Sequence, residues 1–170
     1  MQRSDFEGIY EAMEGRPVTI RYLDPPLHEF LPTSSYDIAT LAQDMNLNID
    51  DLKSIITSLH EFNPMMGHRG CRLAISYPEI AEMQTRAVIE AAINVNRKHP
   101  DYHITPEIMI PLVGDVNELK YVKNIVTKVA DEIISASGIE MKYMVGTMIE
   151  IPRAALLADC LLYTSPSPRD

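Results

Sequence analysis

Cysteine is scarce in this chain, and long apolar runs are absent. The 170 residues include two cysteines, Cys71 and Cys160, too few for a disulfide scaffold, so we expect a reducing, cytoplasmic setting and leave an organellar location open. No apolar run approaches the roughly 18 residues of a membrane span. The first seven residues, MQRSDFE, are polar and acidic, which is unlike a signal peptide. We therefore expect no membrane partner.

Positive charge is also in short supply. Fifteen Lys and Arg stand against 24 Asp and Glu, a net charge of −9 that argues against nucleic acids and anionic membranes as general partners. It does not argue against phosphate binding, which needs only a local group of arginines. Neither a Walker loop nor a Gly-x-Gly-x-x-Gly string occurs, so no ATP site is predicted by motif.

What the chain does contain is an ordinary globular composition, 46% hydrophobic and 23% charged, with strand-like and helix-like segments in alternation. The first part predicts, in order, a helix, a short strand, a proline turn, two modest helices and a loop, at residues 5–13, 18–23, 24–26, 36–45, 49–60 and 63–73.

The second part predicts two long helices, each between strands. Ser76 and Glu79 form a predicted capping box for the first helix, with Pro78 in its first turn, and Asp115 starts the second. The first carries an apolar stripe of Ile80, Met83, Ala87, Val88, Ala91, Ala92 and Val95. Strands are predicted at residues 108–113 and 143–149, and a further helix begins at Pro152.

Strands that alternate with helices predict an α/β fold with parallel strands. Nearly continuous apolar strands are typical of a sheet covered on its faces. Both a β/α barrel and a doubly wound open sheet satisfy this pattern, and in both the carboxyl ends of the strands build the site.

The last eleven residues, 160–170, differ from the rest. They contain two prolines and two serines without periodicity, and they interrupt the helix that begins at Pro152. We interpret residues 1–159 as the domain and residues 160–170 as a foreign tail.

Two strings carry the chemistry. GHRGCR at residues 67–72 offers the guanidinium groups of Arg69 and Arg72, and GTMIEIPRAA at residues 146–155 offers Glu150 just after a predicted strand. Guanidinium groups bind phosphate oxygens, and a carboxylate is a ligand for Mg²⁺. Arg21 also falls near the carboxyl end of its strand. Together they predict a small phosphorylated substrate held with a metal ion.

Three longer strings, VTIRYLDPPLHEFLP at 18–32, HEFNPMMGHRGCRL at 60–73 and the string at 146–155, resemble the phosphoenolpyruvate (PEP)-utilising enzymes. The resemblance is to the C-terminal, PEP-binding TIM barrel of the pyruvate, phosphate dikinases, from about residue 5 to residue 159. It implies roughly half of a (β/α)8 barrel. In these enzymes ATP, phosphate and pyruvate are interconverted with AMP, diphosphate and PEP. A phosphohistidine on another domain exchanges its phosphoryl group with pyruvate in the barrel.

By motif match, the resemblance implies that Arg21 and Arg69 bind the phosphoryl group and that Glu150 is a ligand of Mg²⁺. It also implies a homodimer for the full-length protein. Arg72 and His68 are candidate supporting residues. Arg72 stays open between a partner of Glu150 or the loop and a direct ligand contact. We interpret His68 as a loop histidine bonded to the backbone, and Cys71 as a small packing residue.

The chain also departs from the family pattern. The Asn-Asp pair expected after the next strand, the proton-donating cysteine loop, an upstream arginine and the nucleotide and phosphohistidine domains are absent, and Cys160 does not replace the missing acid. We therefore expect no complete catalytic set and no catalysis by the chain as it stands. The alternatives are a non-catalytic truncated barrel, a fragment of the related PEP synthase or of enzyme I of the phosphotransferase system, and another barrel enzyme acting on pyruvate, such as an aldolase.

Overall fold

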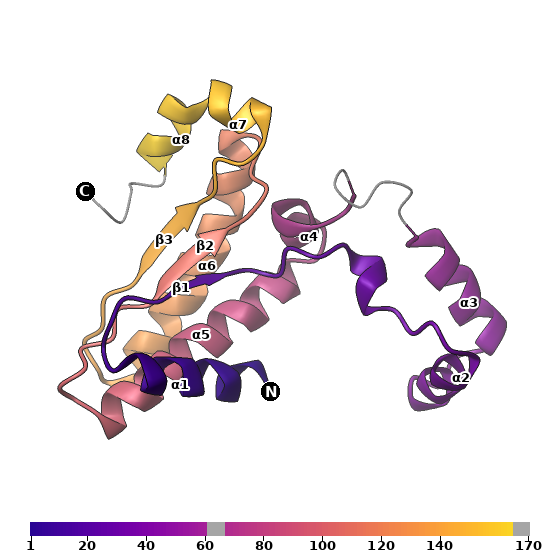
Figure 1. Cartoon of the computed structure of the whole chain (residues 1–170), viewed down its shortest axis with the longest axis horizontal. Helices are drawn as coiled ribbons and strands as arrows, with labels where there is room; N and C mark the ends of the chain where they lie inside the picture. The colour runs from indigo at the N-terminus through magenta and orange to yellow at the C-terminus, as the bar shows by residue number, and fades with distance from the viewer. Residues whose placement is uncertain (61–66, 165–170) are drawn as a thin grey trace. The chain divides into compact units, whose positions relative to one another are not determined.

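The computed structural model describes residues 1–60 and 67–164, which form two compact units. The first unit joins Met1–Asp24 to the chain from Gly70 onward, and the second is Pro25–Arg69. The first contains a three-stranded sheet of β1 (Thr19–Arg21), β2 (Glu107–Ile110) and β3 (Met144–Thr147), in the order β1-β2-β3 (Figure 1). All strands are parallel, so the predicted α/β class and parallel pairing are confirmed.

The register of the sheet sorts its residues onto two faces. Ile20 lies beside Ile108, and Ile108 beside Val145, so these three share one face. Arg21, Met109 and Gly146 form the next row and lie on the other face. Ile20 and Ile108 are buried, whereas Arg21 is exposed. We call the face of Ile20 and Ile108 the covered face, and the face of Arg21 the open face.

Two long helices pack against the covered face. They are α5 (Pro78–Lys98) and α6 (Val116–Ser137), which lie side by side behind the sheet in Figure 1. Their buried residues join the strand residues in one hydrophobic core that includes Ile20, Ile108, Ile110, Val88, Ile89, Ala92, Leu119, Val122 and Val126. A parallel sheet needs such helical cover because its crossover connections run across its face.

The beginning of α6 follows the sequence prediction. The Asp115 side chain caps the helix, and the Glu118 side chain accepts from the Asp115 backbone amide, which completes a capping box. The beginning of α5 does not. Ser76 is the last residue of another helix, α4 (Gly70–Ser76), so Tyr77 is the N-cap and makes no side-chain cap. The predicted Ser76 cap is therefore wrong, although Pro78 does occupy the first turn.

The loop predicted over residues 63–73 is also wrong in part, since α4 begins at Gly70. Residues 63–66 of that loop lie outside the described residues. The first turns of α5 differ as well: Met83 is 45% exposed, and the buried positions there are Ala81, Gln84 and Thr85. Periodicity of apolar residues alone could not identify this face, because two of its three residues are polar.

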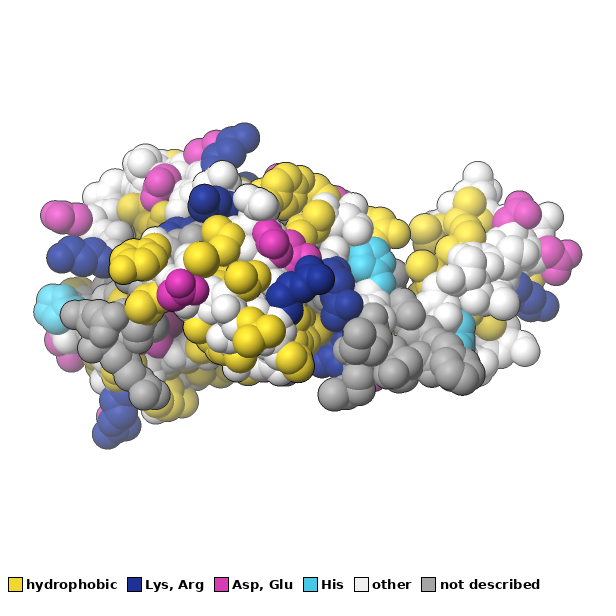
Figure 2. Space-filling model, turned by 90° about the horizontal axis from the view of Figure 1, so that it is seen from above, with side chains coloured by type: hydrophobic (Ala, Val, Ile, Leu, Met, Phe, Trp, Pro, Cys, Tyr) yellow, Lys and Arg dark blue, Asp and Glu magenta, His cyan; other side chains and the backbone are white. Residues whose placement is uncertain are grey.

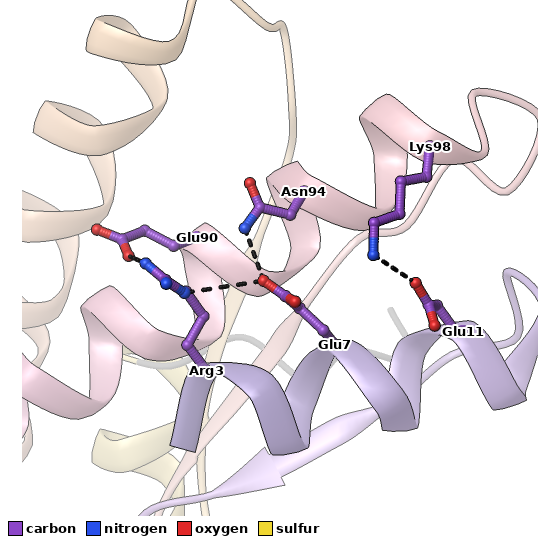
Figure 3. Close-up of polar contacts among 6 residues, drawn as sticks. All are labelled: Arg3, Glu7, Glu11, Glu90, Asn94 and Lys98. Atoms are coloured by element: carbon purple, nitrogen blue, oxygen red, sulfur yellow. Dashed lines mark hydrogen bonds and ion pairs between the residues drawn. The ribbon is translucent and has the colours of Figure 1, made fainter. Parts of the chain in front are cut away.

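The N-terminal helix α1 (Gln2–Met13) packs along α5 (Figure 3). Arg3 pairs with Glu90 at 2.9 Å, and Lys98 pairs with Glu11 at 2.8 Å. Between these pairs the Asn94 amide donates to Glu7 at 2.6 Å. The contacts run along one side of the two helices, so they fix how α1 is aligned along α5.

The second unit contains a short 3-10 helix, η1 (Leu27–Phe30), followed by α2 (Ser35–Asp44) and α3 (Ile49–Ser58). The side chains of Ser34 and Asn48 cap the two α-helices. Both helices were predicted, and the structure confirms them.

The chain is helical as far as Thr164, beyond the interruption predicted at residue 160. After β3 come α7 (Pro152–Leu156) and α8 (Ala158–Thr164), and Leu161 of α8 is 1% exposed within the core. Residues 165–170 lie outside the described residues, and the foreign origin of residues 160–170 stays a prediction. Among the described residues, no helix combines the length and the apolar character needed to cross a bilayer.

Candidate functional site

The carboxyl ends of the three strands bring the candidate site residues to one edge of the sheet. Arg21 is the last residue of β1, Leu112 follows β2 by two residues, and Glu150 follows β3 by three. Because β2 lies between the other two strands, about 9.5 Å separates the axes of β1 and β3 at the usual strand spacing. Arg21 and Glu150 therefore lie on the same edge, with the backbone of β2 between their strands.

Glu150 is exposed, and a backbone amide just after β2 holds its carboxylate. The Leu112 amide donates a hydrogen bond of 2.7 Å to Oε1 of Glu150. Within the described residues this is the one hydrogen bond of the Glu150 side chain, so Oε2 can accept a further ligand. A carboxylate oxygen in this state fits a single position of a Mg²⁺ shell. No group of three His, Cys, Asp or Glu side chains with metal-site geometry occurs among residues 1–60 and 67–164.

The backbone at Leu112 has a rare conformation. Its φ is +59°, which a residue with a Cβ seldom adopts. Against it lies Gly70, the first residue of α4, with a φ of +57°. A Cβ built on Gly70 would lie 3.1 Å from both the Leu112 side chain and the Pro111 carbonyl oxygen. The Cys71 amide donates to the same Pro111 carbonyl at 3.0 Å. The turn Pro111-Leu112 thus contacts α4 on one side and Glu150 on the other.

Cys71 confirms the packing interpretation. Its side chain is fully buried, and burial, with a smaller contribution from the charge of Glu118, raises the pKa of the Cys71 thiol to about 12. The thiol is therefore protonated at neutral pH and is a poor nucleophile.

Arg21 projects from the open face and is held by a carboxylate three residues later. Its Nη1 lies 2.5 Å from Oδ2 of Asp24. The Arg21 side chain is 47% exposed, whereas that of Asp24 is 4% exposed. A buried carboxylate needs a charged or hydrogen-bonding partner, and the guanidinium supplies one.

Buried contacts to α5 and β2 hold the segment between Arg21 and Asp24. The Tyr22 amide donates to the Met109 carbonyl at 3.0 Å, and the Leu23 amide donates to Oε1 of Gln84 at 3.0 Å. The Thr85 hydroxyl donates to a backbone carbonyl of α5, so the Tyr22 hydroxyl is the donor in its hydrogen bond with Thr85. Burial raises the pKa of the Tyr22 phenol, which keeps that donor protonated.

The remaining predicted residues lie in two different places. Arg72 is half-buried on α4, in the first unit with Arg21 and Glu150. His68 and Arg69 are half-buried and are the last residues of the second unit. The structure thus brings Arg21 and Glu150 to one sheet edge and leaves the roles of Arg69, Arg72 and His68 as predictions.

Beyond this edge, hydrophobic side chains gather over α7 and α8 (Figure 2). The large hydrophobic residues exposed there are Leu156, Leu162 and Tyr163, at 84%, 50% and 90%. The same two helices also expose Arg153 and Asp159. We favour the strand-end edge as the candidate site because it brings an arginine and a carboxylate to the carboxyl ends of parallel strands.

Two contributors to the site escaped the sequence analysis. Asp24 was interpreted only as part of the Asp-Pro-Pro turn, although an aspartate three residues after a strand-end arginine is a signal that could have identified the pair. The Leu112 amide left no signal, because a backbone donor is the same in every residue except proline.

Comparison with known proteins adds a family. Residues 1–164 match the family described as PEP-utilising enzyme, PEP-binding domain. The chain is 58% identical over 160 residues to a pyruvate, phosphate dikinase of Clostridium symbiosum and 55% identical over 161 residues to one of Rhizobium meliloti (strain 1021). It is 53% identical over 160 residues to the chloroplastic pyruvate, phosphate dikinase 1 of Arabidopsis thaliana. These alignments cover 94%, 95% and 93% of the chain, but only 18%, 18% and 16% of the relatives.

Proposed function

Since the chain belongs to the PEP-utilising enzymes, by their PEP-binding domain, we propose that it forms part of the pyruvate- and PEP-binding site of a pyruvate, phosphate dikinase. The resemblance drawn from the sequence strings is thereby confirmed at the level of the family. The observation that carries the proposal is the placement of Arg21 and Glu150 at the carboxyl edge of one parallel sheet. In β/α barrels this edge carries the site. On this proposal the three strands would be part of a (β/α)8 barrel.

Arg21 would bind the phosphoryl group. A guanidinium offers five N–H donors, and Asp24 engages only one terminal nitrogen of Arg21. Phosphoryl transfer spreads negative charge over the equatorial oxygens, and a fixed cation stabilises that charge. Arg69 would contribute a second guanidinium, with Arg72 and His68 in support. These roles rest on the motif match.

Glu150 would be one ligand of a Mg²⁺ ion, through the carboxylate oxygen that the Leu112 amide leaves available. Bound Mg²⁺ would supply Lewis-acid polarisation of the substrate oxygens. The hydrogen bond from Leu112 would hold the Glu150 side chain in one orientation, which limits the freedom lost when the ligand binds.

The partners of the site follow from the same proposal. The substrates would be pyruvate and PEP, and the phosphoryl donor would be a phosphohistidine on another domain of a full-length dikinase. That protein would act as a homodimer in the cytoplasm or in an organelle; relatives named above include bacterial and chloroplastic proteins. Because the chain spans less than a fifth of those relatives, we propose that residues 1–170 alone do not catalyse the reaction.

A segment exchange tests this function. The 160-residue segment of the Clostridium symbiosum dikinase that aligns with this chain is replaced by the chain's own residues, which are 58% identical to it. We expect the chimaera to form PEP from ATP, phosphate and pyruvate. Arg21→Gln and Glu150→Gln should each lower kcat at least about 100-fold, the usual loss when a group that stabilises transition-state charge is removed.

Arg86→Gln is the matched control. Arg86 lies on α5 in an exposed ion pair with Glu90, so its loss removes the same kind of charge away from the edge. A folded chimaera that keeps full activity with both Arg21→Gln and Glu150→Gln would contradict the proposed site. A folded chimaera that binds PEP but never turns over would favour the non-catalytic alternative for this segment.

A further inference from the structure

We propose that Asp24 is a positioning residue for Arg21, a role that rests on the proposed function of the strand-end site. Asp24 would hold the Arg21 guanidinium in one orientation and leave its remaining N–H groups available for the phosphoryl oxygens. The contact between Nη1 and Oδ2 is 2.5 Å long, and it joins an exposed guanidinium to a buried carboxylate.

The carboxylate itself is held firmly. Asp24 precedes Pro25, which restricts its backbone to extended conformations. The two residues before it are anchored by the amides of Tyr22 and Leu23, to β2 and to Gln84 respectively. A side chain that is 4% exposed and follows an anchored backbone has few alternative rotamers. Asp24 is therefore a fixed acceptor.

Arg21 in contrast would be mobile without that acceptor. It is 47% exposed on the open face, and within the described residues Asp24 is its one hydrogen-bond partner. A long side chain that is ordered only upon ligand binding loses rotamer freedom at that moment. A guanidinium already held by Asp24 loses less rotamer freedom. The Arg21–Asp24 pair therefore lowers the entropic cost of binding a phosphate.

Charge acts in the opposite direction. The Asp24 carboxylate repels a phosphate and partly offsets the attraction of Arg21. Asp24→Asn keeps the shape of the side chain and removes its charge, so electrostatics alone predicts tighter phosphate binding. Loss of positioning predicts weaker binding. The sign of the change separates the two effects.

The experiment uses the 170-residue chain labelled with 15N-arginine, and the Nε–Hε signal of Arg21 is assigned by its loss in Arg21→Lys. PEP and inorganic phosphate are titrated separately. We expect the Arg21 signal to shift with PEP, and Asp24→Asn to weaken binding about two- to tenfold, the effect of freeing one rotamer-rich side chain. Asp24→Glu, which keeps the carboxylate, should recover part of that loss. Glu11→Gln, which removes a carboxylate from the exposed pair with Lys98, should change nothing.

Binding by a folded Asp24→Asn variant that equals or exceeds that of the unmodified chain overturns the inference. If Asp24→Asn does not fold, the mobility of the Arg21 guanidinium in the unmodified chain tests the inference instead. Heteronuclear relaxation should show it to be more rigid than that of Arg86, whose ion pair is 3.5 Å long. Equal mobility overturns the inference. An Arg21 signal that is rigid but does not respond to PEP counts against the proposed function while keeping the role of Asp24 in ordering Arg21.

Discussion

The two faces of the three-stranded sheet differ in what covers them and in what they carry. The covered face presents Ile20 and Ile108 to α5 and α6, within a continuous apolar core. The open face presents Thr19, Arg21 and Glu107, none of which is buried. Residues on the covered face thus stabilise the fold by burial, whereas these three residues of the open face are accessible to solvent. Substitutions on the two faces should therefore have different consequences.

The largest difference should separate two neighbours on β2. Ile110 is fully buried on the covered face, so Ile110→Ala should lower the free energy of unfolding by about 2–5 kcal/mol through lost burial and a cavity. Met109 is half-buried on the open face, and Met109→Ala should cost at most about 1 kcal/mol. Urea unfolding followed by circular dichroism measures both. Equal losses would show that the open face is covered in solution, for instance by a second copy, which sedimentation would detect.

Thiol reactivity sharpens the comparison without a substitution. Cys71 is buried with a pKa of about 12, and Cys160 is exposed on α8. Because its pKa is raised, the Cys71 thiol stays protonated at pH 8, and little thiolate is present. We expect Cys160 to react with a thiol reagent at least about 100-fold faster than Cys71. Similar rates would mean that α4, which carries Cys71, readily opens away from the core.

A pair of glycine variants probes the Pro111-Leu112 turn. Gly70→Ala introduces a Cβ at a φ of +57° and 3.1 Å from two neighbours, whereas Gly138→Ala has a φ of +70° with nothing within 4 Å. Gly138→Ala should cost about 1 kcal/mol for the backbone alone. Gly70→Ala should cost about 1–2 kcal/mol more. Thermal unfolding measures the difference in stability between the two variants. Equal losses of stability would show that α4 can shift away from Leu112 at little cost.

The smallest effect is expected at the amino end of the open face. The Thr19 hydroxyl donates to the Glu107 carboxylate at an exposed position. Thr19→Val replaces that contact by a methyl group with good strand propensity, so stability should change by no more than about 0.5 kcal/mol. In the Thr19→Val variant, PEP should still shift the Nε–Hε signal of Arg21 as it does in the unmodified chain. A large loss of stability would place part of the core on the open face.

Much of the covered face could be predicted from the sequence, because apolar residues at helical spacing share one face of a helix, and that face is usually buried. The stripe of α5 from Ala87 to Val95 was predicted in this way and is buried, and the start of α6 at Asp115 was predicted as well. The prediction failed at α4 and at the first turns of α5. There Gly70 begins a helix instead of marking a loop, and Gln84 and Thr85 are buried because they bind the chain around Tyr22 and Leu23. Such contacts depend on the fold as a whole, which local patterns do not encode.

The candidate site shows the same division. Arg21 and Glu150 could be found as charged residues at predicted strand ends, and the structure places both at the carboxyl edge. The Leu112 amide could not, since a backbone donor leaves no mark in the sequence, and Asp24 was overlooked although its spacing from Arg21 offered a signal. The strings matched to a family pointed to Arg21 and Glu150 but not to the groups that contact their side chains.

The hydrogen bond from Leu112 to Glu150 has a consequence for how such a site is mapped. β2 lies between the strands of Arg21 and Glu150, and the contact with Glu150 comes from a peptide N–H two residues after β2. An alanine scan replaces side chains and leaves every peptide group in place, so it would not detect the Leu112 donor. Replacing the single amide of Leu112 by an ester, which removes the donor and keeps the side chain, is the substitution that would measure what this hydrogen bond contributes.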